Sequence, residues 1–191
     1  SRWDSKASVL LGDFLFTHAF YLASTLDSTW ACRAIGRSTN IVCEGELRQK
    51  GSRGDFALEE AEYIEIIAAK TAELCACSCQ LGAHYAGATP DIVDRFTRFG
   101  RDLGIAFQII DDLLYMIGDE TEMGKSLGTD LDQQKPTLPL IHVFSHVSVE
   151  ERDNVINAIG DGLPGRNVLS PWMERFGTQE YVRGRARWFA D

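Results

Sequence analysis

The sequence FGRDLGIAFQIIDDLLYMIG, residues 99–118, decides the fold that we predict for this chain. At 100° per residue, its apolar side chains cover most of a helical circumference and leave one narrow polar stripe. The stripe contains Arg101, Gly104, Gln108, Asp111, Asp112 and Tyr115. A helix that is apolar almost all round is predicted to be buried, and a buried carboxylate is unfavourable unless it is paired or bound to a metal ion.

Two adjacent aspartates in such a helix favour a cation site. The alternative is a surface helix whose aspartates face water, but nearly every residue flanking the pair is apolar. Carboxylates, with a glutamine one turn earlier, supply the oxygen ligands that Mg²⁺ prefers, and Mg²⁺ keeps several waters whose positions a phosphate can share. We therefore interpret the stripe as the wall of a metal and diphosphate cavity, with Asp111 and Asp112 as metal ligands.

The composition narrows the class of protein. The 191 residues are 45% hydrophobic, which is enough for one domain or a large part of one. With 28 acidic and 19 basic residues the net charge is −9, which argues against binding to nucleic acid. There is no run of 18 apolar residues, and SRWDSK at the start lacks the pattern of a secretory signal. We expect a cytoplasmic protein without a transmembrane segment, and its odd number of cysteines fits a reducing compartment.

Helical periodicity accounts for the other apolar segments. Further helices are predicted at residues 6–25, 29–49, 58–86, 138–146, 150–160 and 171–190, with loops at 50–55 and 160–171. No strand-like alternation is long enough to compete, so the predicted fold class is all-α. Asp13, inside the first of these helices, is expected to be buried with a partner.

Several polar residues allow two interpretations each. Lys70 stands in an apolar row of the 58–86 helix, so it either extends its ammonium to the edge or points at a buried anion, with Thr71 beside it. Glu46 and Gln49 either line a cavity or face solvent. Residues 111–135 hold seven acidic side chains but only two lysines, Lys125 and Lys135. They form either a solvated acidic loop or a site where divalent cations bridge a diphosphate that both lysines also contact.

Six blocks, in order, carry a resemblance to a known family: KASVLLGD, GELRQ, IIAAKTAEL, GIAFQIIDDLLY, GKSLGTDL and KPTLPLIH. The chain resembles the trans-polyprenyl diphosphate synthases from residue 3 to about residue 143. The resemblance implies an isoprenoid synthase-type bundle of mostly antiparallel helices around a central cavity, normally a homodimer. GELRQ is more similar to synthases that make longer chains for quinone side chains than to the short-chain type.

The implied activity is that of a prenyltransferase. Several Mg²⁺ ions bridge the diphosphate of an allylic substrate and draw it off, and the resulting cation is attacked by isopentenyl diphosphate. Loss of a proton gives a longer trans-polyprenyl diphosphate. Metal ions suit this step because they stabilise charge that develops on the leaving oxygen.

The resemblance also implies roles for individual residues. Asp111 and Asp112 match the second aspartate-rich motif, and Lys70, Lys125 and Lys135 match the lysines that hold the allylic diphosphate. Thr71 and Gln108 match polar groups near the developing cation. Phe107 matches an aromatic residue lining the cavity. Two positions depart from the family pattern: Tyr115 stands in place of a third aspartate, and Gln134 replaces the usual glycine before Lys135.

The resemblance begins after the first aspartate-rich motif of the family. We therefore interpret residues 1–191 as a single partial all-α polyprenyl synthase domain without that motif and the N-terminal helices, and we expect this piece alone to be inactive. One alternative is a non-catalytic partner subunit of a heteromeric prenyl synthase, although the retained Lys70, Gln108 and Asp111 argue against it. The other is a class I terpene cyclase, which GKSLGTDL and KPTLPL disfavour.

Overall fold

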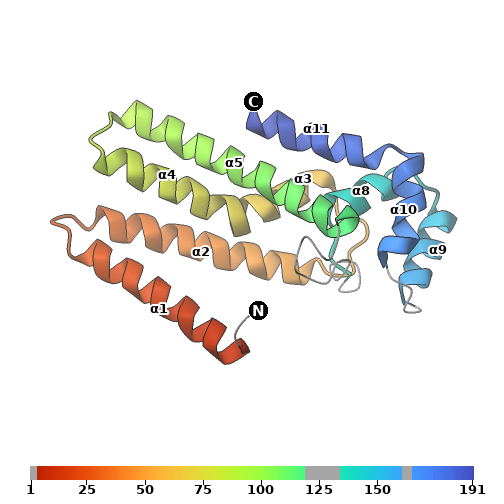
Figure 1. The fold of residues 1–191 in the computed structure, drawn as a ribbon, viewed down its shortest axis with the longest axis horizontal. Coiled ribbons are helices and arrows are strands. Elements are labelled where there is room, and N and C mark those ends of the chain that lie inside the picture. Colours follow the sequence, from red (N-terminus) through yellow and green to blue (C-terminus); the bar gives the residue numbers. More distant parts are fainter. Residues whose placement is uncertain (1–3, 119–133, 161–164) are drawn as a thin grey trace.

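The structure is a computed structural model that describes residues 4–118, 134–160 and 165–191. Throughout these ranges the regular structure is helical and contains no strand, so the predicted all-α fold class is confirmed. Four long helices form the body of the molecule: α1 (Ser5–Ser24), α2 (Trp30–Gly51), α4 (Glu73–Tyr85) and α5 (Pro90–Ile117). Figure 1 shows them as a layer in which α2 and α5 flank α4 and α1 lies beyond α2.

The segment predicted as one helix at 58–86 is interrupted by a π-helical turn. It consists of α3 (Glu60–Ile67), the π-helix η1 (Ala68–Ala72) and then α4. Single π turns inside α-helices are found frequently at functional sites, because they turn the following side chains to a new direction. Lys70 and Thr71 both lie in this turn, so η1 determines where these two candidate site residues point.

Three glycines let α2 and α5 approach the backbone of η1 and α4 closely. A Cβ atom added at Gly45 of α2 would lie 2.6 Å from the backbone nitrogen of Lys70. One at Gly104 of α5 would lie 2.5 Å from the Cα atom of Ala72, and one at Gly100 would lie 2.6 Å from the carbonyl oxygen of Cys75. Because these three positions lack a Cβ atom, α2 and α5 can pack directly on the backbone of η1 and α4. This packing fixes the positions of Lys70 and Thr71 relative to both helices.

The hydrophobic core lies on the second half of α5. Ile105, Ile109, Leu113 and Met116 are buried there against side chains of α3, α8 (Leu138–Phe144) and α11 (Thr178–Ala190). The prediction that α5 is buried almost all round is wrong on one side, where Phe99, Leu103 and Phe107 are 57%, 49% and 62% exposed. Leu103 and Phe107 face an open groove of about 380 Å³ beside α11.

The C-terminal half departs from the prediction in its helix boundaries. Helix α8 and α9 (Val149–Gly160) match the segments expected at 138–146 and 150–160. The single helix expected at 171–190 is instead α10 (Gly165–Arg175) followed by α11. Gly177 separates them with φ 62°, a left-handed conformation that favours glycine and ends a helix.

Helix α1 is far more exposed than expected. Of its twenty residues only Ala23 is buried, and Asp13 is exposed, so the prediction that Asp13 is buried with a partner is wrong. Helix α1 lies against α2 where Phe20 comes within 3.9 Å of the Cβ position of Gly36. By length and composition alone, α1 is also the one described helix that could cross a membrane, and its apolar window is only 6% buried. The expected absence of a transmembrane segment therefore stays a prediction.

Candidate functional site

A chain of hydrogen bonds joins α3, η1 and α5. The Tyr63 hydroxyl donates to Asp112 Oδ2, and Gln108 Nε2 donates to Asp112 Oδ1, both at 2.8 Å. At the other end, Thr71 Oγ1 donates to Gln108 Oε1 at 2.8 Å. Tyr63, Gln108 and Asp112 are all buried. Since each amide and carboxylate atom of Gln108 and Asp112 has a defined partner, the side chains of this network have one orientation.

Asp112 has its charge satisfied inside the protein. Its carboxylate is in a residue only 1% exposed, and both oxygens accept hydrogen bonds, as a buried carboxylate requires. Asp111 is half-buried and makes no hydrogen bond or ion pair within the described part of the chain. Asp111 is therefore the better placed of the two to contact a metal ion directly. No group of three His, Cys, Asp or Glu side chains with metal-binding geometry occurs among the described residues, so metal binding stays a prediction.

Lys70 reaches across to α2. Its Nζ donates to Gln49 Oε1 at 2.7 Å and lies 3.7 Å from Glu46 Oε1, and its side chain is only 15% exposed. Lys70 therefore does not extend into solvent. Gln49 is half-buried beside it, while the Glu46 side chain is 58% exposed and faces solvent as well as Lys70. A lysine ammonium has three donors, and the hydrogen bond to Gln49 uses one of them. Through Lys70 and Thr71, η1 is bonded to α2 on one side and to α5 on the other.

The other predicted site residues lie around this network. Asp111 and Tyr115, both half-buried, follow Gln108 along α5, and Phe107 precedes it on the exposed side of the helix. Lys135 is half-buried just before α8. The predicted roles of Lys125 and of the acidic residues 119–132 fall outside the described residues. The structure thus brings together Thr71, Gln108 and Asp112 through hydrogen bonds, with Lys70 beside Thr71 in η1.

Gln134 has the backbone conformation of a glycine. Its φ is 55°, and no other non-glycine residue has a positive φ among the described ranges. Its carbonyl oxygen accepts a hydrogen bond from Gly54 N at 2.8 Å, which ties the segment before Lys135 to the loop after α2. A left-handed residue with a side chain costs roughly 1–2 kcal/mol. The conformation at this position therefore favours the glycine that Gln134 replaces.

The sequence did not predict the partner of Asp112. Tyr63 belongs to the apolar row of the segment 58–86 in which Lys70 also stands, and a buried tyrosine hydroxyl usually needs a hydrogen-bond partner. That requirement was the available signal, but the partner lies 49 residues away in the chain.

A second polar cluster, also not predicted, fastens α11 to α3 and α8. The Tyr181 hydroxyl and Arg185 Nε both bond the Glu60 carboxylate, the latter at 2.6 Å, and His142 Nδ1 lies 3.0 Å from Thr178 Oγ1. Burial raises the pKa of Tyr181 to about 12, and the bond to Glu60 adds to this. Burial also lowers the pKa of His142, as does nearby His146, while Glu60 opposes the shift. These contacts secure the helix that packs on the core of α5.

Known proteins similar to this chain identify its family. Residues 1–169 match the family model described as "Polyprenyl synthetase". Octaprenyl diphosphate synthase of Escherichia coli (strain K12) is 38% identical over 194 residues, covering 100% of this chain and 60% of that protein. Heptaprenyl diphosphate synthase component 2 of Geobacillus stearothermophilus is 36% identical over 150 residues, covering 78% and 47%. The structure of polyprenyl synthase from Caulobacter crescentus CB15, complexed with calcium and isoprenyl diphosphate, superposes with a TM-score of 0.82 at 32% identity, covering 98% and 60%.

The chain therefore spans 60% or less of the length of these relatives. Its helices have the all-α isoprenoid synthase fold of the solved polyprenyl synthases. Since the family model matches 169 of the 191 residues, the chain belongs to the polyprenyl synthetase family.

Proposed function

We propose that the whole protein is a prenyltransferase that condenses isopentenyl diphosphate with an allylic diphosphate to give a longer trans-polyprenyl diphosphate, for quinone side chains. The observation that carries the proposal is the π turn η1. Within it, Lys70 bonds to Gln49 of α2, and Thr71 bonds to Gln108 of α5, which in turn bonds to Asp112. The turn therefore links a cation and two polar oxygens to the helix that carries the aspartate pair. The names of the relatives, octaprenyl and heptaprenyl diphosphate synthase, support a long product.

The donor set fits Mg²⁺, a hard cation that prefers oxygen ligands. Asp111 would hold it, because its carboxylate has no partner in the described part of the chain, while Asp112 would keep α5 and the Gln108 amide in place. Bound Mg²⁺ ions would supply the positive charge that stabilises the departing diphosphate. Calcium, another hard cation, accompanies isoprenyl diphosphate in the Caulobacter crescentus structure.

The other residues would act on the substrate directly. Lys70, Lys125 and Lys135 would contact diphosphate oxygens as point charges. Thr71 Oγ1 and Gln108 Oε1 would present partial negative charge to the allylic carbon as it becomes positive. Phe107 and Tyr115 would form apolar walls beside it. Fixed donors and acceptors of this kind assist a reaction because they need no rearrangement as charge develops.

The test uses the intact protein with labelled isopentenyl diphosphate, an allylic primer and Mg²⁺. Label in a longer diphosphate is expected, and chelation of Mg²⁺ should abolish it. The variant Asp111→Asn should lower turnover on the order of a hundredfold, because a lost charge contact in the transition state costs about 3 kcal/mol. Asp94→Asn, on an exposed part of α5, is the matched control and should leave turnover unchanged. An unaltered rate in Asp111→Asn would exclude Asp111 as a metal ligand.

A second candidate function is a partner subunit of a heteromeric synthase. It is favoured by Tyr115 in place of an aspartate and by similarity to a protein named component 2 of heptaprenyl diphosphate synthase. In the same assay, product would then form only after a partner protein is added. A cyclic hydrocarbon product would instead identify a class I terpene cyclase.

We further propose that the protein is a cytoplasmic homodimer. The exposed apolar side chains of α1 support this assembly, because soluble monomers rarely expose contiguous apolar patches of that kind.

A further inference from the structure

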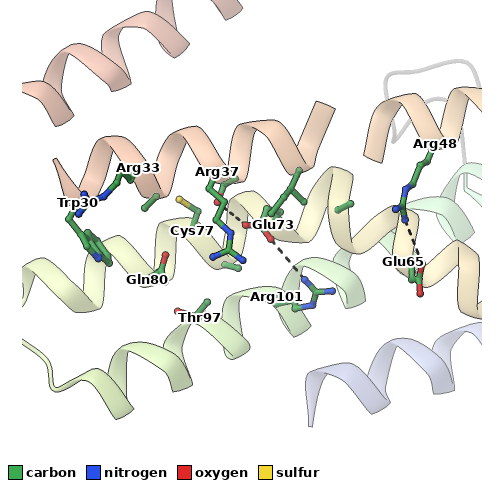
Figure 2. A pocket seen from close by; sticks show the side chains of 15 residues that line it. Trp30, Arg33, Arg37, Arg48, Glu65, Glu73, Cys77, Gln80, Thr97 and Arg101 are labelled. Atoms are coloured by element: carbon green, nitrogen blue, oxygen red, sulfur yellow. Dashed lines mark hydrogen bonds and ion pairs between the residues drawn. The ribbon is translucent and has the colours of Figure 1, made fainter. Parts of the chain in front are cut away.

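A separate cavity lies between α2, α4 and α5. Its volume is about 680 Å³, within the range typical of small-molecule sites. Ala34, Ile41, Ala69 and Ala76 supply apolar walls. Figure 2 shows polar side chains converging on it from all three helices. The labelled ones include Trp30, Arg33, Arg37, Glu73, Gln80, Thr97 and Arg101. Ser38 also lines the cavity.

This cavity has a lining of its own, although Arg101 belongs to the same polar stripe of α5 as Gln108. None of Lys70, Thr71, Gln108 and Asp111 lines it. At about 100° per residue, Arg33 and Arg37 lie more than about 100° around α2 from Glu46 and Gln49, which contact Lys70. The two sites therefore use different faces of the same helix.

The cavity walls carry an excess of positive charge in a chain whose net charge is −9. The walls include four arginines and only two glutamates, and each glutamate is already paired. Glu65 lies 3.6 Å from Arg48, while Glu73 lies 4.0 Å from Arg101 and also accepts a hydrogen bond from Ser38 at 2.8 Å. Arg33 and Arg37 make no ion pair within the described part of the chain. The unpaired charge is therefore concentrated at these two residues.

Arg33 and Arg37 are both exposed, and their spacing on α2 would let both contact one anion. Residues four apart on a helix are neighbours, and two like charges there destabilise the helix by roughly 0.2–0.5 kcal/mol. An anion held between them would remove this repulsion. A guanidinium presents donors in a planar fork that matches phosphate oxygens two at a time. Figure 2 shows Arg37 extending from α2 into the space between the helices and Arg33 near Trp30.

We infer that this cavity binds a small phosphate-bearing anion through Arg33 and Arg37 without a metal ion. The site is distinct from the proposed metal site, where acidic side chains require a cation to bridge them to a diphosphate. A ligand in this cavity would contact α2, α4 and α5. Helices α2 and α5 also pack against η1.

The test is a titration of the intact protein with inorganic diphosphate in the presence of EDTA. Isothermal titration calorimetry measures the binding. Chelation removes any binding that depends on a metal ion, so Asp111→Asn should leave the measured affinity unchanged. We expect saturable binding of one diphosphate and a loss of affinity of at least tenfold in Arg33→Gln/Arg37→Gln. The control Arg95→Gln/Arg98→Gln removes two exposed arginines from α5 and the same net charge, and its affinity should stay within twofold.

Arg37→Lys provides a second variant, since it keeps the charge and loses only the forked geometry. Its affinity should fall several-fold while its unfolding transition matches that of the parent. Absence of saturable binding in EDTA, an equal loss in both double variants, or a loss in Asp111→Asn would each overturn the inference. Competition by ATP or by isopentenyl diphosphate then identifies the organic group that the cavity accepts beside Trp30, and displacement by either supports a phosphate site.

Discussion

The Tyr63 hydroxyl stabilises the buried carboxylate of Asp112 by a hydrogen bond. Its hydroxyl bonds Oδ2 at 2.8 Å in an environment where Asp112 is 1% exposed. Tyr63→Phe keeps the ring and removes this donor. The free energy of unfolding should fall by about 1–3 kcal/mol, since a buried acceptor that loses a partner bears its full desolvation penalty. Urea denaturation measures the change.

Tyr85→Phe is the matched control for this substitution. Tyr85 is 48% exposed near the end of α4, where water can replace any partner of its hydroxyl. The control should change the free energy of unfolding by less than about 0.5 kcal/mol. Equal effects of the two substitutions would show that the bond to Asp112 contributes nothing specific.

The sequence predicts some of this network and not the rest, for a physical reason. Gln108 and Asp112 are four residues apart, so helical periodicity alone places them on one polar stripe. The bonds of Tyr63 to Asp112 and of Thr71 to Gln108 span 49 and 37 residues, and they depend on how helices pack. Periodicity along one helix holds no information on which neighbour a hydroxyl will meet.

At the scale of helices, Gly104 sets the distance between α5 and η1. A Cβ atom there would lie 2.5 Å from Ala72 Cα, which is backbone and cannot move aside. Gly104→Ala should therefore push the helices apart and destabilise the protein by about 1–3 kcal/mol, even though alanine favours helix by about 1 kcal/mol. The bond between Thr71 and Gln108 crosses this contact, so prenyl transfer should fall as well. Chemical denaturation and the labelled-substrate assay measure the two effects.

Gly82 offers the same substitution in α4 without the contact. Nothing lies within 4 Å of its Cβ position, so Gly82→Ala should stabilise the protein by about 0.5–1 kcal/mol and leave prenyl transfer unchanged. If the two alanine variants were equally stable, the close approach at Gly104 would be refuted.

The element boundaries that periodicity missed have identifiable causes. The residues of η1, AAKTA, are compatible with an ordinary helix, and the π turn forms where Gly45 and Gly104 bring α2 and α5 against it. The break at Gly177 lies between Phe176 and the polar residues Thr178, Gln179 and Glu180. A glycine after a basic last turn is a helix stop signal that the periodicity did not register, and the left-handed φ of 62° shows that it separates α10 from α11.

At the scale of the whole molecule, the surface of α1 stands out because its large apolar side chains are exposed. Seven large apolar side chains of this helix are between 45% and 67% exposed: Val9, Leu10, Phe14, Leu15, Phe16, Tyr21 and Leu22. Full burial of an exposed apolar side chain of this size gains roughly 1.5–3 kcal/mol, and burial of the exposed part of each of these would gain about half of that. In a two-fold symmetric interface, the apolar surface of α1 would be buried in both protomers at once. We therefore assign α1 to the interface of the proposed homodimer.

Replacing Leu10 and Phe14 by lysine tests that assignment, because the two side chains are one turn apart on the exposed face of α1 and 67% and 59% exposed. In a two-fold symmetric dimer each substitution acts twice, so Leu10→Lys/Phe14→Lys should raise the dimer dissociation constant a hundredfold or more. Sedimentation equilibrium measures it. Val149→Lys on α9, where Val149 is 75% exposed, should leave the dimer intact. A dimer insensitive to the α1 variant would place the interface elsewhere, and α1-dependent cosedimentation of a monomer with phosphatidylcholine vesicles would show that α1 contacts a membrane instead.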